Sequence, residues 1–414
     1  MKGRYVDIPA PDGRAFRAYL ATPASGTGPG IVLCQEIFGV NATMRDVADY
    51  YAEEGYTVLA PDLFWRVEPG IELGYTEAGF ARAFELYQQY DEDQGVEDIG
   101  ATLDVLRALP ECQGEVGVLG FCLGGKLAWL AACRLSVACA VSYYGVGIEQ
   151  ALGEAANIKG RVVLNIAALD RFCPPGAQQQ ITAALRRNEN VEVHVYPGVD
   201  HAFARKGGDH FDKPSAMMAH ERAVAAFRKT MGPQYDLSAL WEEHLAHEFT
   251  TRDVDATMAT MVAEPYVNHI PTLTGGVGYT ELKRFYRHHF VHANPSDTAI
   301  TPISRTIGAT QIVDEMLFCF THTTEIDWML PGIAPTGRRV EIPLLAVVKF
   351  RGDKLYHEHI YWDQASVLVQ IGLLDPNGLP TTGADTARKL LDETLASNTL
   401  MKRWQESVPA NDAH

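Results

Sequence analysis

The sequence lacks the features that mark exported, membrane-spanning and nucleic-acid-binding proteins. No apolar run among its 414 residues reaches the roughly 18–20 residues needed to cross a bilayer. The start has no basic segment followed by an apolar one, so we expect no export signal. Lysine and arginine total 35 against 52 aspartates and glutamates, and the formal net charge of −17 repels nucleic acid and anionic membranes. We therefore expect neither as a partner.

Cysteine is also sparse. The seven cysteines are scattered without a CxxC pair, and their odd number argues against a disulfide framework. This pattern predicts a reducing compartment, the cytoplasm. The sequence contains no internal repeat and no low-complexity tract, and we assign no cofactor and no metal to it.

What is present indicates two globular domains. A hydrophobic fraction of 47% and a charged fraction of 21% are typical of globular proteins, and 414 residues exceed one ordinary core. Gly and Pro punctuate a linker at 232–238 between a first domain, 1–231, and a second, 239–402. The polar residues 403–414 are expected to form a frayed tail.

The first domain alternates apolar strands with amphipathic helices. This alternation predicts an α/β fold with a mostly parallel sheet covered on both faces. The expected strands are 30–36, 57–64, 115–121, 138–145, 161–170 and 191–198. The second domain has helices first, at 238–262 and 279–290, and strands later, which predicts an α+β domain with an antiparallel sheet.

The sequence GFCLGG at 120–125 follows a predicted strand and opens a predicted helix. This is the G-x-nucleophile-x-G elbow of α/β-hydrolases, with Cys122 as the nucleophile at a helix N-terminus that favours thiolate. Asp170 and His201 follow later strands in the order acid, then base, and lie at the same sheet edge. The alternatives are a buried structural cysteine, a surface aspartate and a satisfied loop histidine.

Residues about 5–231 resemble the dienelactone hydrolase (carboxymethylenebutenolidase) family. The resemblance rests on QEIFGVN, PDLF, GFCLGG, YYGVG and HAFAR. It implies a cysteine hydrolase that acts through a thioester on a small ester or lactone, anionic or neutral. It also implies that Cys122, Asp170 and His201 form the triad and that Glu36 meets the thiol at rest and promotes thiolate formation when substrate arrives.

Further site residues follow from geometry and from this resemblance. The backbone N–H of Leu123, next to the nucleophile, and that of Ile37 are the expected oxyanion donors. Arg205 matches the family's substrate arginine. The ungapped register places Phe80 at the family's second arginine, with Arg82 two residues later, so Arg82 is a weaker candidate; Phe84 is expected either in an aromatic wall or in the core.

Residues about 236–402 resemble the SnoaL-like branch of the NTF2-like superfamily through EPYVNHIPTLTGG, ELKRFYRHHF and HEHIYWDQASVLVQIGLL. This implies a cone-shaped α+β domain with an apolar pocket, often dimeric. The pocket candidates are His269, Asp363 and His359, although Asp363 equally suits a helix N-cap. The main alternatives for the whole chain are another small ester or lactone as substrate, or a role set by the second domain as a ligand-binding or homodimerisation module.

Overall fold

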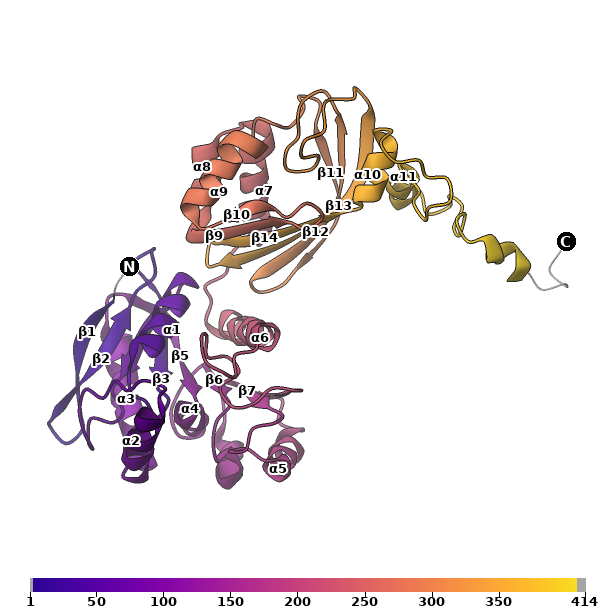
Figure 1. Cartoon of the computed structure of the whole chain (residues 1–414). Coiled ribbons are helices and arrows are strands. Elements are labelled where there is room, and N and C mark those ends of the chain that lie inside the picture. The colour runs from indigo at the N-terminus through magenta and orange to yellow at the C-terminus, as the bar shows by residue number, and fades with distance from the viewer. Residues whose placement is uncertain (1–2, 408–414) are drawn as a thin grey trace. The chain divides into compact units, whose positions relative to one another are not determined.

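The computed structural model describes residues 3–407 and divides the chain into two compact units, with the boundary in the sequence between Tyr235 and Asp236 (Figure 1). This boundary lies inside the segment 232–238. No helix among residues 3–407 is both long and apolar enough to cross a membrane.

The first unit is built on one eight-stranded sheet in the order β1-β2-β4-β3-β5-β6-β7-β8. Neighbouring strands from β4 to β8 are parallel. The hairpin formed by β1 and β2, which the sequence analysis did not identify, adds an antiparallel edge. The strands are β1 (Arg4–Pro9), β2 (Ala15–Ala21), β3 (Gly28–Cys34), β4 (Thr57–Pro61), β5 (Cys112–Phe121), β6 (Cys139–Tyr143), β7 (Arg161–Ala167) and β8 (Val191–Tyr196).

Helices cover both faces of this sheet and bury two separate cores. The pleat of β3 explains the division, because Val32 points into one core and Leu33 into the other. The first core is covered by α2 (Glu77–Gln88), α3 (Glu92–Ala108), α4 (Leu123–Arg134), η1 (Ile148–Asn157) and α5 (Pro175–Leu185). The second is covered by α1 (Ala42–Glu53) and α6 (Lys213–Met231).

The second unit has a six-stranded sheet in the order β10-β9-β14-β13-β12-β11. The strands are β9 (Met261–His269), β10 (Thr274–Val277), β11 (Ala299–Ile307), β12 (Gln311–Thr321), β13 (Arg339–Arg351) and β14 (Lys354–Trp362). The expected antiparallel sheet needs correction, since β14 pairs with β9 in parallel and makes the sheet mixed. Residues 261–262, expected at the end of a helix, begin β9 instead.

The helices of the second unit include two π-helical turns. One, Ala246–Thr250, continues α7 (Leu237–Leu245); the other, Tyr286–Phe290, continues α9 (Tyr279–Phe285). The remaining helices are α8 (Val254–Ala259), α10 (Gln364–Gln370), α11 (Asp385–Leu391) and the 3-10 helix η4 (Lys402–Ser407). The predicted frayed tail, 403–414, thus begins inside η4, and residues 408–414 lie outside the described residues.

Candidate active site

The turn from β5 to α4 holds Cys122 in a backbone conformation that side chains rarely adopt, with φ of +55°. Its N–H is anchored by the carbonyl of Tyr143 at 3.0 Å. A methyl group on Gly120 would lie 1.9 Å from the Gly124 carbonyl oxygen, and one on Gly124 would lie 2.2 Å from that of Cys34. The two glycines therefore permit the close strand–helix approach that the elbow requires.

His201 joins Cys122 to Asp170. Its Nδ1 lies 2.7 Å from Asp170 Oδ2, and the Cys122 side chain lies close enough to its ring to raise its pKa. Asp170 follows β7 and His201 follows β8, so the carboxyl ends of adjacent parallel strands bring them to the elbow. The structure brings together the three residues that the sequence analysis selected as nucleophile, base and orienting acid.

The charges around His201 favour its protonated form. Burial opposes protonation, but negative charge on Cys122 and on Asp170, together with hydrogen bonds to both, outweighs it and raises the pKa of His201 to about 10. The rings of Tyr144 and Phe172 pack edge-on against the imidazole at 4.9 and 5.0 Å. This arrangement favours the imidazolium form of His201.

Two backbone N–H groups around the elbow, those of Leu123 and Ile37, have no acceptor in the described part of the chain. Leu123 begins α4, and Ile37 lies in the loop after β3. That loop is attached to the elbow because the N–H of Gly124 donates to the Gln35 carbonyl at 3.0 Å. Within residues 3–407, neither the Leu123 nor the Ile37 N–H donates a hydrogen bond, so both remain available for a developing oxyanion.

Glu36 has a different partner from the one that the family resemblance implied. Its carboxylate, only 2% exposed, accepts two hydrogen bonds from Arg205, at 2.9 and 3.0 Å, and further ones from Tyr75 and Tyr144. Among the described residues, no hydrogen bond joins Glu36 to the Cys122 thiol. The expected pairing with the thiol is therefore replaced by one with the guanidinium of Arg205, which satisfies the buried carboxylate.

Helix α2 presents Phe80, rather than Arg82, to this cluster. The Phe80 ring lies 6.3 Å from that of Phe38, which itself packs beneath the Arg205 guanidinium at 5.5 Å. Arg82 instead forms exposed ion pairs with Glu68 and Glu85, and Phe84 is 45% exposed. Arg82 therefore lies away from the cluster, because two residues turn a helix by about 200°, onto another face. Phe84 is not in the core; its ring lies 6.3 Å from that of Tyr87, and its place in an aromatic wall stays a prediction.

In the second unit, only one of the three predicted pocket residues lines the cavity. His269 does so, and burial lowers its pKa to about 4, so its ring is neutral near pH 7. Asp363 caps α10, the alternative role that its sequence context allowed. His359 stacks on His357 at 4.5 Å on the other side of β14, because side chains alternate along a strand. Their neighbour Glu358 is the one that lines the cavity.

The sequence analysis also missed Tyr75 and Phe38, which pack around Arg205, and His244 and Glu248 in the second unit. The sequence does contain a signal for His244 and Glu248, because a histidine and a glutamate four residues apart lie on one face of a helix and can form a site together. Tyr75 lies in a loop before α2, where no periodicity indicates which residues point inward.

Comparison with known proteins places this site in a family. The model of the dienelactone hydrolase family matches residues 16–231, just over half of the chain. A protein of Azospirillum brasilense, provisionally named a carboxymethylenebutenolidase, is 42% identical over 239 residues, which are 55% of this chain and 99% of that protein. The carboxymethylenebutenolidase of Pseudomonas putida is 37% identical over 220 residues, 53% of this chain and 93% of that enzyme.

Among solved structures, a provisionally named dienelactone hydrolase from Klebsiella pneumoniae covers 55% of this chain and 98% of its own, with 28% identity and a TM-score of 0.49. The site and the family match together define an α/β-hydrolase that acts on carboxylic esters. The chain belongs to the dienelactone hydrolase family.

Proposed function

We propose that the chain hydrolyses a small ester or lactone of the dienelactone type through a thioester on Cys122. The observation that carries this proposal is the pairing of His201 with Asp170 at 2.7 Å, at the sheet edge where the strained elbow holds Cys122. The family's activity gives the reaction class, and the residues give each group its role.

In the first half of the reaction, the Cys122 thiolate attacks the carbonyl carbon. The negative charge that develops on the carbonyl oxygen is stabilised by the N–H groups of Leu123 and Ile37. Collapse of this tetrahedral species breaks the C–O bond, and the leaving oxygen takes the proton held by His201. In the second half, neutral His201 removes a proton from water, which hydrolyses the thioester and releases the acid and the thiolate.

Arg205 and Glu36 suit a substrate that carries one carboxylate. A carboxylate arriving at Arg205 would compete with Glu36 for the same fork of N–H groups. Phe80, close to Phe38, adds apolar surface where the family resemblance led us to expect a second arginine. We therefore favour a monoanionic or neutral lactone with an apolar edge over a substrate held by two arginines.

A hydrolysis panel tests this proposal. We expect turnover of dienelactones and small activated esters, highest kcat/KM for a lactone with a single carboxylate, and accumulation of an acyl-enzyme detectable by mass spectrometry after a rapid quench. Full activity without any Cys122 adduct, or activity retained in Cys122→Ala, would overturn the thioester route.

For residues 239–402 we propose an NTF2-like cone domain that joins two copies of the chain into a homodimer. Its mixed sheet and its aromatic-lined cavity support this assignment. The same cavity favours a second candidate role, in which this domain binds a small ligand and hydrolysis is secondary.

We also propose a cytoplasmic location, which the seven free thiols of the chain support.

A further inference from the structure

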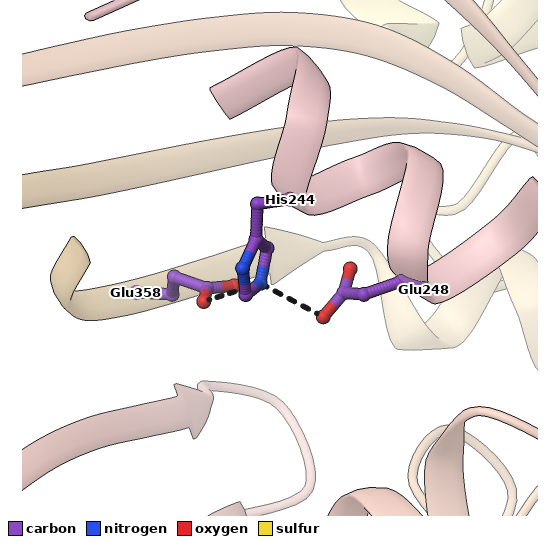
Figure 2. Close-up of side chains that lie close together, drawn as sticks. All are labelled: His244, Glu248 and Glu358. Carbon is purple, nitrogen blue, oxygen red and sulfur yellow. Dashed lines mark hydrogen bonds and ion pairs between the residues drawn. The ribbon is translucent and has the colours of Figure 1, made fainter. Parts of the chain in front are cut away.

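One histidine and two glutamates meet in the interior of the second unit, outside the hydrolase site (Figure 2). His244 comes from α7, Glu248 from the π-helical turn that continues it, and Glu358 from β14. His244 Nε2 lies 3.1 Å from Glu248 Oε1 and 3.2 Å from Glu358 Oε1. All three residues are buried, with at most 3% of their surface exposed.

The other ring nitrogen of His244 is oriented by a threonine. Thr260 Oγ1 donates its hydrogen to the Thr257 carbonyl at 2.7 Å, so it acts as acceptor toward His244 Nδ1 at 2.6 Å. Nδ1 therefore carries a hydrogen, and Nε2 is the nitrogen that faces the two carboxylates. A histidine ligand that donates its second N–H to a fixed oxygen is the usual arrangement around protein metal sites.

The two carboxylates lack sufficient positive charge. Among residues 3–407, no lysine or arginine forms an ion pair with Glu248 or Glu358, and His244 is their shared partner. Tyr286 adds one hydroxyl, which donates to Glu358 Oε1 at 3.4 Å and also interacts with Glu248. Even a protonated His244 offers one N–H to two anions and leaves one negative charge buried, which costs several kcal/mol in a protein interior.

A cavity borders the cluster and has room for solvent ligands. Its volume is about 30 Å³, whereas one water needs roughly 10–15 Å³ on this measure. Glu248, Glu358 and Tyr286 line it together with His269, and the rest of the wall is mostly apolar. Both Glu248 and Tyr286 lie on π-helical turns, which are concentrated at functional sites.

We propose that His244, Glu248 and Glu358 bind one divalent first-row transition-metal ion, such as Mn²⁺, Fe²⁺ or Zn²⁺, with water in the neighbouring cavity completing its coordination. The ligand atoms all lie within 4.8 Å of one another. One imidazole and two carboxylates form a ligand set for these ions rather than for Ca²⁺, which takes oxygen ligands alone. Three protein ligands plus water is the composition of an open metal site.

The test uses the full-length protein, stripped with a chelator and then titrated with Mn²⁺. Mn²⁺ is chosen because thiolates bind it poorly, so that Cys122 does not compete. We expect one Mn²⁺ per chain by elemental analysis, a bound-ion electron paramagnetic resonance signal and a rise in the unfolding temperature. Glu358→Gln should abolish all three, whereas Glu243→Gln, which changes an exposed glutamate next to His244 in the sequence, should abolish none.

Thr260→Val gives a milder test that leaves the ligands in place. Loss of a residue that orients a ligand typically weakens metal affinity about 10–100-fold, and we expect an effect of that size in the Mn²⁺ titration. Anomalous scattering from a Mn²⁺-soaked crystal should place the ion at about 2.0–2.3 Å from the three ligand atoms. Wild-type protein without stoichiometric Mn²⁺ or Zn²⁺, or with an ion that Glu358→Gln does not release, would overturn the proposal.

Discussion

Arg205 binds the carboxylate of Glu36 through two separate nitrogens, Nε at 3.0 Å and Nη2 at 2.9 Å. The two side chains are 16% and 2% exposed, so this is a largely buried, bidentate ion pair. Both groups are expected to serve the reaction, yet each also satisfies the charge of the other. Substitutions at either position therefore affect stability as well as activity.

The first prediction concerns that coupling. Arg205→Ala should lower the free energy of unfolding by about 3–5 kcal/mol, because it leaves the Glu36 carboxylate buried without its partner. The double variant Arg205→Ala/Glu36→Gln should recover part of this loss, since the uncompensated charge is gone. Urea denaturation of the single and double variants measures the difference; equal stability of Arg205→Ala and wild type would contradict it.

Arg205 should also discriminate between substrates. Under conditions where Arg205→Ala remains folded, kcat/KM for a lactone with a carboxylate should fall about 10- to 150-fold. This corresponds to about 1.5–3 kcal/mol, the value of a hydrogen bond to a charged group. Neutral aryl esters should be spared. Arg82→Ala, which removes an exposed arginine of α2, is the matched control and should change neither. Equal losses for both substrate classes would assign Arg205 a structural role alone.

Cys122→Ala should reduce hydrolysis by roughly 10⁴-fold or more, as expected when a triad nucleophile is removed. Its thermal unfolding should stay close to that of the wild type. Cys112→Ala, which removes a partly buried thiol on β5, should keep its activity and serves as the control. Turnover above a tenth of the wild-type rate in Cys122→Ala would point to another nucleophile.

His201 should remain protonated well above neutral pH. Its pKa is raised from its ordinary value of 6.5 to about 10, so its contribution to stability is complete below about pH 6.5 and is lost as the pH rises through about 10. Cys122→Ala removes a negative charge that favours the imidazolium and should shift the pKa down. Titration of the labelled imidazole by NMR compares the two proteins; identical midpoints would refute the pairing.

The last prediction concerns independence of the two units. A chain that ends after Tyr235 should fold alone and hydrolyse small esters within a few-fold of the full-length rate, because the triad, the oxyanion donors and Arg205 all precede that residue. Tyr235 should be kept, since its ring packs against Arg228 of α6 at 5.0 Å. Light scattering should find the full chain dimeric and the shortened one monomeric; a shortened dimer would contradict the proposed interface.

Local signals in the sequence were sufficient to predict the parallel sheet of the first unit and to select the residues of its candidate site. The nucleophile elbow is a contiguous motif, and Asp170 and His201 each follow an apolar strand whose end defines one edge of the sheet. Side-chain orientation on α2 was not predictable in this way. Arg82 and Phe80 differ by two positions, and the register of a helix against its sheet depends on contacts distant in sequence.

In the second unit, side-chain orientation on a strand was equally unpredictable from the sequence. A period of two correctly groups His357 and His359 on one face of β14, but it does not say which face is turned inward. That depends on the parallel pairing of β14 with β9, about ninety residues earlier, and on the helices that pack above the sheet. Glu358 could therefore be recognised as a buried cavity residue only from the arrangement of the strands in the structure.

The two π-helical turns give the second unit an unusual sensitivity to chain length. Each residue added to or removed from a helix rotates everything beyond it by about 100°. Insertion of one residue between His244 and Glu248 would place them five positions apart and turn Glu248 by about 140° from His244, without changing any of the three clustered residues. Homologues could gain or lose this cluster through a single-codon insertion or deletion, so the spacing between His244 and Glu248 is as informative in comparing sequences as the identity of the residues.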